Sequence, residues 1–98
     1  MQPNQSQNQQ QLQVKYDDKT LQGVYSNAAQ VQFQKEEFVI DFMNQFPPMA
    51  TLNARVILSP GHAKRLAAVL DGVVKNYEAQ YGPVEASSAP NEIGFPTK

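Results

Sequence analysis

The stretch SPGHAKR, residues 59–65, contains the side chains best placed to do chemistry, including the only histidine of the chain. Backbone N–H groups at a helix start can bind an anion, and neighbouring basic side chains would assist. The alternative is a structural helix start, which we favour because one glycine does not make a phosphate-binding loop. The positions concerned are Ser59, Pro60, Gly61, His62, Lys64 and Arg65.

No convincing catalytic set accompanies this stretch. The chain has no cysteine nucleophile, no second histidine and no clustered carboxylates with metal-ligand spacing. Glu36 and Glu37 fit the solvated tip of a hairpin better than an acid/base pair. We therefore expect a protein without enzymatic activity, cofactor or metal.

Charge also limits the possible partners. Eight basic against nine acidic residues give a net charge of -1, so neither nucleic acid nor an anionic membrane is attracted overall. A nucleic-acid or ribonucleoprotein-associated role using Lys64, Arg65 and Lys75 stays open but is disfavoured. The sequence also lacks a signal-like N-terminus and an apolar run of the roughly 20 residues that cross a bilayer. We expect a soluble, cytoplasmic protein that does not enter a membrane.

Composition divides the 98 residues into three parts. Residues 1–20 are rich in Gln and Asn and are expected to form a disordered arm. Residues 21–83 are expected to form a single β-β-β-α domain, and residues 84–98 a flexible tail. A core of about 60 residues without disulfides is marginally stable alone, which favours self-association.

Alternating apolar residues predict a hairpin over residues 23–42. An antiparallel turn on Lys35 and Glu36 pairs Phe33 with Phe38, and places the alternating apolar sets of the two strands on the same face. Pro47 and Pro48 then end the second strand. The same alternation in TLNARVIL predicts a third strand whose inward residues are Leu52, Ala54, Val56 and Leu58.

The opposite, outer face of this sheet is not wholly polar. Asp41 and Arg55 share it, either as an exposed ion pair, which we favour, or as a polar contact across an interface. Val39, Met43 and Ile57 also lie on it, and this apolar content suggests that something covers the outer face.

A helix is predicted from the Ser59 N-cap to the stop at Gly82 and Pro83. Its apolar residues recur every three or four positions and form a stripe wide enough to pack on the sheet. We call them the helix stripe: Ala63, Leu66, Ala67, Leu70, Val73, Val74, Tyr77 and Tyr81. A second line of small residues suggests close approach of another backbone: Gly61, Ala68, Gly72 and Ala79. The alternative is that Gly72 has no packing role and only lowers the stability of the helix by an amount that the protein tolerates.

The polar residues of YSN, at positions 25–27, interrupt the alternation of the first strand. The hairpin register places Asn27 opposite Asn44 and Tyr25 opposite Phe46, on the face toward the helix. We interpret Asn27 first as half of a hydrogen-bonded Asn27–Asn44 pair that sets the register, and second as a binding residue. Ser26 belongs to the same motif.

Several motifs together resemble a prokaryotic family called domain of unknown function 3467. They are VYSN, FVIDF, ILSPGHAKRL and YEAQYG, in that order, and the resemblance spans about residues 21–84. It implies a small bacterial or archaeal intracellular protein and transfers no catalytic or ligand residue.

These observations predict an α+β fold, in which a three-stranded antiparallel sheet is followed by one long helix packed on it. We expect a non-enzymatic binding or scaffolding module that acts as a homodimer with a still unknown protein partner. The dimer would form through the outer face of the sheet, a strand edge or the small-residue line of the helix. A chaperone-like protein that binds extended peptides at a strand edge is a further alternative.

Overall fold

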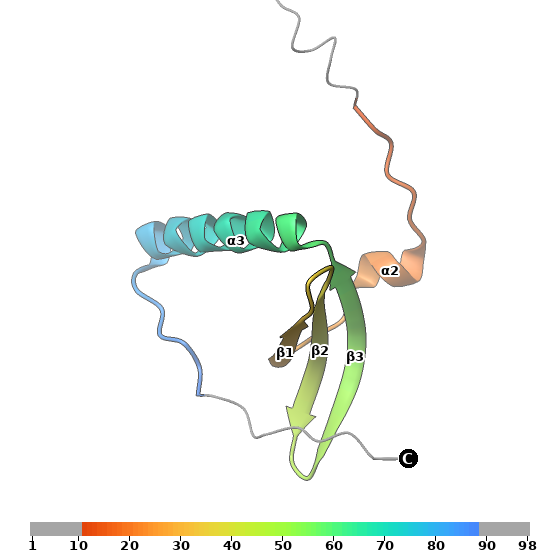
Figure 1. Cartoon of the computed structure of the whole chain (residues 1–98). Helices are drawn as coiled ribbons and strands as arrows, with labels where there is room; N and C mark the ends of the chain where they lie inside the picture. Colours follow the sequence, from red (N-terminus) through yellow and green to blue (C-terminus); the bar gives the residue numbers. More distant parts are fainter. Residues whose placement is uncertain (1–10, 89–98) are drawn as a thin grey trace, which may run out of the picture.

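The computed structural model describes residues 11–88, in which a three-stranded antiparallel sheet is followed by a long helix (Figure 1). The elements in chain order are α2 (Asp18–Gln22), β1 (Ala28–Phe33), β2 (Phe38–Phe46), β3 (Met49–Leu58) and α3 (Pro60–Tyr81). The predicted α+β class and the order of its strands and long helix are confirmed. The strand order is β1-β2-β3, so β1 and β3 are both edge strands.

The β1–β2 hairpin has the predicted register. Phe33 pairs with Phe38 and Val31 with Ile40, and Gln34 and Glu37 exchange backbone hydrogen bonds of 2.8 and 3.4 Å around the two-residue turn. The turn forms without a residue of positive φ at Lys35 or Glu36, although tight hairpins usually favour such residues. The pairing of the apolar residues on one face therefore outweighs the turn sequence.

Strand β3 differs from the prediction at Asn53. Phe42 pairs with Ala54 but the next residue, Met43, pairs with Leu52, so Asn53 is an extra residue in the ladder, a β-bulge. Because side chains alternate along a strand, the bulge moves Leu52 to the face opposite Ala54. The prediction that Leu52 points inward together with Ala54 is wrong for this reason.

One face of the sheet is covered by the segment that joins α2 to β1. This segment passes behind β3 and β2 in Figure 1. Tyr25 belongs to the segment, and its backbone carbonyl accepts a 2.7 Å hydrogen bond from the Asn53 side-chain amide of β3. Met43, expected on an outer face open to a partner, is only 2% exposed and is the most buried large side chain among residues 11–88. The prediction that Met43 lies in an interface is therefore wrong, because the chain itself buries this side chain.

Helix α3 has the predicted ends. The Ser59 hydroxyl accepts a hydrogen bond from the His62 backbone N–H, Pro60 is the first helical residue, and Gly82 follows the last turn with a φ of 95°. A positive φ is easily adopted only by glycine, which explains the stop there.

The prediction that α3 packs on its own sheet is wrong. The helix leaves the end of β3 and runs across the end of the sheet, so most of its length lies beyond the strands (Figure 1). It contains no buried residue and barely touches the sheet. The physical reason is the connection, because Ser59 alone separates β3 from α3 and leaves no loop in which the chain can turn back.

The N-terminal part is more ordered than expected. Residues 18–20, placed in the disordered arm, form the start of helix α2, which Asp17 caps by accepting a hydrogen bond from the Thr20 backbone N–H. The expectations for residues 1–10 and 89–98 lie outside the described residues.

Candidate interaction surface

The YSN motif is part of the frame of the sheet. The Asn27 side chain donates to the Gln45 carbonyl at 3.1 Å and accepts from the Gln45 backbone N–H at 2.7 Å, which imitates one more residue pair of the β1–β2 ladder. The Ser26 hydroxyl lies 2.8 Å from the Ala28 carbonyl oxygen and 3.0 Å from that of Met43. Both side chains thus hold the start of β1 against β2.

The expected Asn27–Asn44 side-chain pair does not form. Asn27 is bonded to the backbone of Gln45 instead, because its amide reaches the ladder groups beyond the end of β1. The Oδ1 atom of Asn44 is buried with no hydrogen-bond partner among residues 11–88. The Tyr25 side chain is 67% exposed, and its residue contributes to the frame through its backbone carbonyl.

Asp41 and Arg55 form a bidentate ion pair on the covered face. Nε and Nη2 of Arg55 donate to the two carboxylate oxygens of Asp41 at 2.7 and 2.9 Å. Asp41 is only 3% exposed, so the expectation of an exposed pair is wrong for the carboxylate, although half of the Arg55 side chain remains in water. The hydrogen bonds from Arg55 lower the pKa of Asp41 against the opposing effect of burial.

The polar groups at the start of α3 contact one another. Nη2 of Arg65 lies 3.0 Å from Nδ1 of His62, and since a guanidinium only donates, this histidine nitrogen accepts. The Ser59 hydroxyl already accepts a hydrogen bond from the His62 backbone N–H. The first turn is therefore a capped helix start, with Pro60, Gly61 and Lys64 exposed around it.

The basic residues of α3 do not make a continuous patch. Nζ of Lys75 lies 3.0 Å from Oδ2 of Asp71, one turn away on the same helix. Arg65 faces His62 as described above. These two cations thus have a partner within their own helix, and Lys64 is the third, exposed basic residue of α3.

The second face of the sheet, which we call the open face, is apolar, and most of it is uncovered. Cross-strand partners share a face, so the register assembles three rows of side chains on it. Val31 and Phe33 on β1 are 57% and 76% exposed and the residues of the central strand are half-buried, whereas Leu58, at the end of β3 next to α3, is only 8% exposed. The rows are Phe33, Phe38 and Leu58; Val31, Ile40 and Val56; and Ala29, Phe42 and Ala54.

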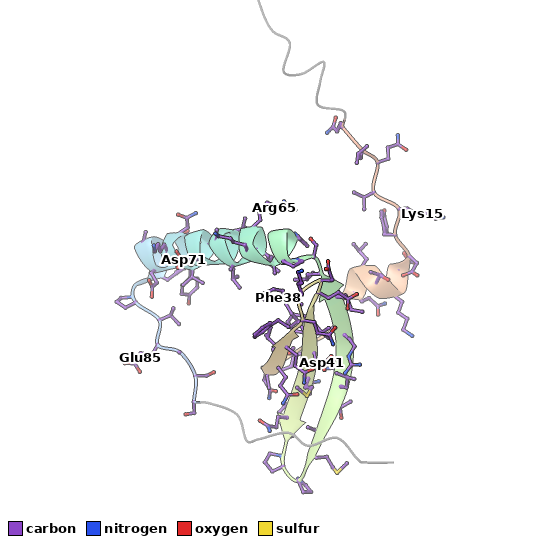
Figure 2. The ribbon with its side chains drawn as sticks, viewed as in Figure 1. Lys15, Phe38, Asp41, Arg65, Asp71 and Glu85 are labelled. Carbon is purple, nitrogen blue, oxygen red and sulfur yellow. The ribbon has the colours of Figure 1, made fainter. Side chains whose placement is uncertain are left out.

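The helix stripe is a second uncovered apolar surface. Its six large side chains are all between 39% and 68% exposed: Leu66, Leu70, Val73, Val74, Tyr77 and Tyr81. The rings of Tyr77 and Tyr81 contact each other with centroids 5.0 Å apart. In Figure 2 side chains project above and below α3, and most of the helix lies beyond the strands.

The remaining candidate interface positions are scattered. Val39 is half-buried and Ile57 is 58% exposed on the covered face. Ala68 and Ala79 are exposed on α3, and a Cβ added at Gly72 would meet nothing within 4 Å. The close backbone approach suggested for Gly72 is therefore absent within this chain.

Sequence reasoning treated the open face and the helix stripe as one internal core and missed that both are exposed. The signal was in the sequence, because ILSP places the predicted helix cap directly after the last strand residue. Two further features also went unseen: the bulge at Asn53 and the segment that covers Asp41 and Met43.

Residues 11–88 contain neither a membrane-spanning helix nor a cluster of metal ligands. No helix there is both long and apolar enough to cross a membrane. No group of three or more His, Cys, Asp or Glu side chains in this part of the chain is arranged to hold a metal ion.

Comparison with known proteins agrees with the motif resemblance and adds no activity. No curated protein and no solved structure gives a significant match. A family model described as Protein of unknown function (DUF3467) matches residues 1–86, which includes the Gln-rich arm as well as the folded part. The chain therefore belongs to the DUF3467 family of proteins of unknown function.

Proposed function

We propose that this protein is a non-enzymatic protein-binding module that works as a homodimer. The observation that carries the proposal is the double exposure of apolar surface, on the open face and on the helix stripe of the same chain. Soluble proteins rarely leave apolar patches of more than a few hundred Å² in water, and larger ones mark interaction sites.

The exposed area has the size of a protein–protein interface. Half-exposed Leu, Val and Tyr side chains leave on the order of 80–100 Å² each, so the large exposed side chains of the helix stripe and of the three rows together leave roughly 700–900 Å² per chain. A standard interface buries about 800 Å² on each partner. An interface of standard size is therefore large enough to cover both apolar surfaces.

The pairing of the charged groups supports a protein partner over nucleic acid. Of the three cations that phosphates would need, Arg65 and Lys75 already contact groups of their own helix, which leaves Lys64 exposed. The most exposed side chains of the two surfaces are aliphatic or aromatic instead.

A matched pair of helix variants tests this function. Leu70→Glu places a carboxylate on the helix stripe, and Ala68→Glu places one on the opposite side of α3; both positions are exposed in the single chain. Losing a buried leucine costs about 1.5–3 kcal/mol, so we expect Leu70→Glu to raise the dimer dissociation constant at least about tenfold. Ala68→Glu should leave it unchanged.

Light scattering coupled to size-exclusion chromatography, over a micromolar concentration series, measures this constant. A strict monomer for the unmodified protein would overturn the proposal. If both variants raise the dissociation constant equally, the interface is not specific to the helix stripe, and that assignment is wrong.

A further inference from the structure

We propose that two copies exchange helices, so that α3 of each chain packs on the open face of the other. This inference rests on the proposed homodimer and states how it is built. It commits to a second copy as the occupant, because one chain carries both halves of a helix-on-sheet core and brings neither half to the other.

The connection between β3 and α3 prevents closure within one chain. Strand β3 ends at Leu58 and α3 begins at Pro60, whereas connections from a strand to a helix usually have about 2–6 residues. Ser59 is extended, with φ of -68° and ψ of 154°, and its carbonyl accepts from the Ala63 N–H at 2.9 Å. Turning the helix back would break this first turn and the serine cap.

The helix stripe and the central strand match in length. From Leu66 to Tyr81 the helix stripe is about 22 Å long at 1.5 Å per residue. From Phe38 to Phe46 the central strand is about 26 Å long at 3.3 Å per residue, and the three apolar rows of the open face, from Phe38 to Phe42, take up about 13 Å of it. A helix laid along the open face of a second copy would therefore cover the strand without a large overhang.

The two surfaces also match in chemistry. The most exposed large side chains in the three rows of the open face are Val31 and Phe33, and those of the helix stripe are aliphatic and aromatic as well. The ion pair of Asp71 and Lys75 sits on the flank of the helix, where it can stay in water when the stripe is covered. No charged group has to be buried in such a complex along the stripe.

Exchange by a twofold axis also sets the stoichiometry. Each chain gives one helix and receives one, so the contact is the same in both directions and closes at two copies. Assembly stops at the dimer, and no open face remains to extend it into a filament.

Disulfide trapping tests the exchange directly, because the natural chain contains no cysteine. Val56→Cys, on the open face, is combined in turn with Leu66→Cys, Leu70→Cys or Val73→Cys on the helix stripe. Three stripe positions are used so that one lies near Val56 whatever the sliding of the helix along the sheet. The matched control combines Val56→Cys with Ala68→Cys, on the opposite side of the helix.

We expect at least one stripe pair to run as a covalent dimer on a non-reducing gel, with at least about tenfold more product than the control. The single variants should remain uncrosslinked. An intrachain disulfide in a monomer, or crosslinking of the Leu70→Cys single variant, would overturn the exchange in favour of fold-back or of helix–helix pairing.

The outcome for the unmodified protein separates the two proposals. A monomer in light scattering removes the homodimer and the exchange together. A dimer in which none of the three stripe pairs crosslinks removes the exchange and leaves the homodimer standing.

Discussion

Asn27→Ala tests whether the YSN motif holds the sheet together. The substitution removes two hydrogen bonds to the backbone of Gln45, of 2.7 and 3.1 Å, at the end of the β1–β2 ladder. Each hydrogen bond contributes about 0.5–1.5 kcal/mol, so the free energy of unfolding should fall by about 1–3 kcal/mol. Against a typical total of about 5–15 kcal/mol, such a loss is easily measured.

Equilibrium unfolding in urea, followed by far-ultraviolet circular dichroism, measures the change. Protein concentration must be equal for all variants, because dimerisation adds to apparent stability. Asn27→Asp keeps the acceptor for the Gln45 N–H and loses the donor, so it should retain part of the stability. Gln32→Ala, an exposed change on the same strand, is the control for loss of a polar strand side chain.

Hydrogen exchange gives a local measure of the same contact. The Gln45 amide donates to Oδ1 of Asn27, so we expect it to exchange faster in Asn27→Ala than in the control. If Asn27→Ala is as stable as Gln32→Ala and the Gln45 amide stays protected, the structural role of Asn27 is refuted.

Three further perturbations test other parts of the frame. Asp41→Asn should cost about 1–2 kcal/mol in urea unfolding, less than the 3–5 kcal/mol of fully buried pairs because Arg55 is half in water. Since the folded pKa of Asp41 lies below its ordinary 3.8, the pair's stabilisation is complete above that value and is lost as pH falls through the folded pKa; an acid titration without this extra loss relative to Asp41→Asn would contradict it. Ser59→Ala should lower stability by about 1 kcal/mol in thermal unfolding, and no change would mean that the cap is not used. Gly72→Ala should stabilise α3 by about 1 kcal/mol and leave dimerisation intact, since the site has open space; a loss of dimer in light scattering would instead place the small-residue line in the interface.

The hairpin and the limits of the helix could be predicted because each depends on local rules. The pairing of Phe33 with Phe38 follows from side-chain alternation, since a slip by one residue would send an apolar face into water. The ends of α3 follow from the Ser59 cap and from the positive φ at Gly82, which are chemical requirements of single residues.

The bulge at Asn53 could not be predicted from alternation alone. The pattern Leu52, Ala54, Val56 is regular, so nothing in its period shows that Leu52 turns to the other face. The bulged residue makes a contact distant in sequence, since the Asn53 side-chain amide donates a hydrogen bond to the Tyr25 carbonyl of the covering segment. The burial of Asp41 and Met43 depends on the same segment and was missed with it.

The helix stripe shows a different limit of sequence reasoning. Apolar residues that repeat every 3.6 positions indicate that one side of α3 needs an apolar partner surface, and how wide that surface must be. They do not indicate which chain supplies it. The missing information is the length of the connection, where Ser59 alone lies between β3 and α3. A long loop would have allowed the helix to close its own core, whereas a single capped residue directs it away. The same short connection that defeats the single-chain interpretation is therefore the strongest structural reason for a second copy.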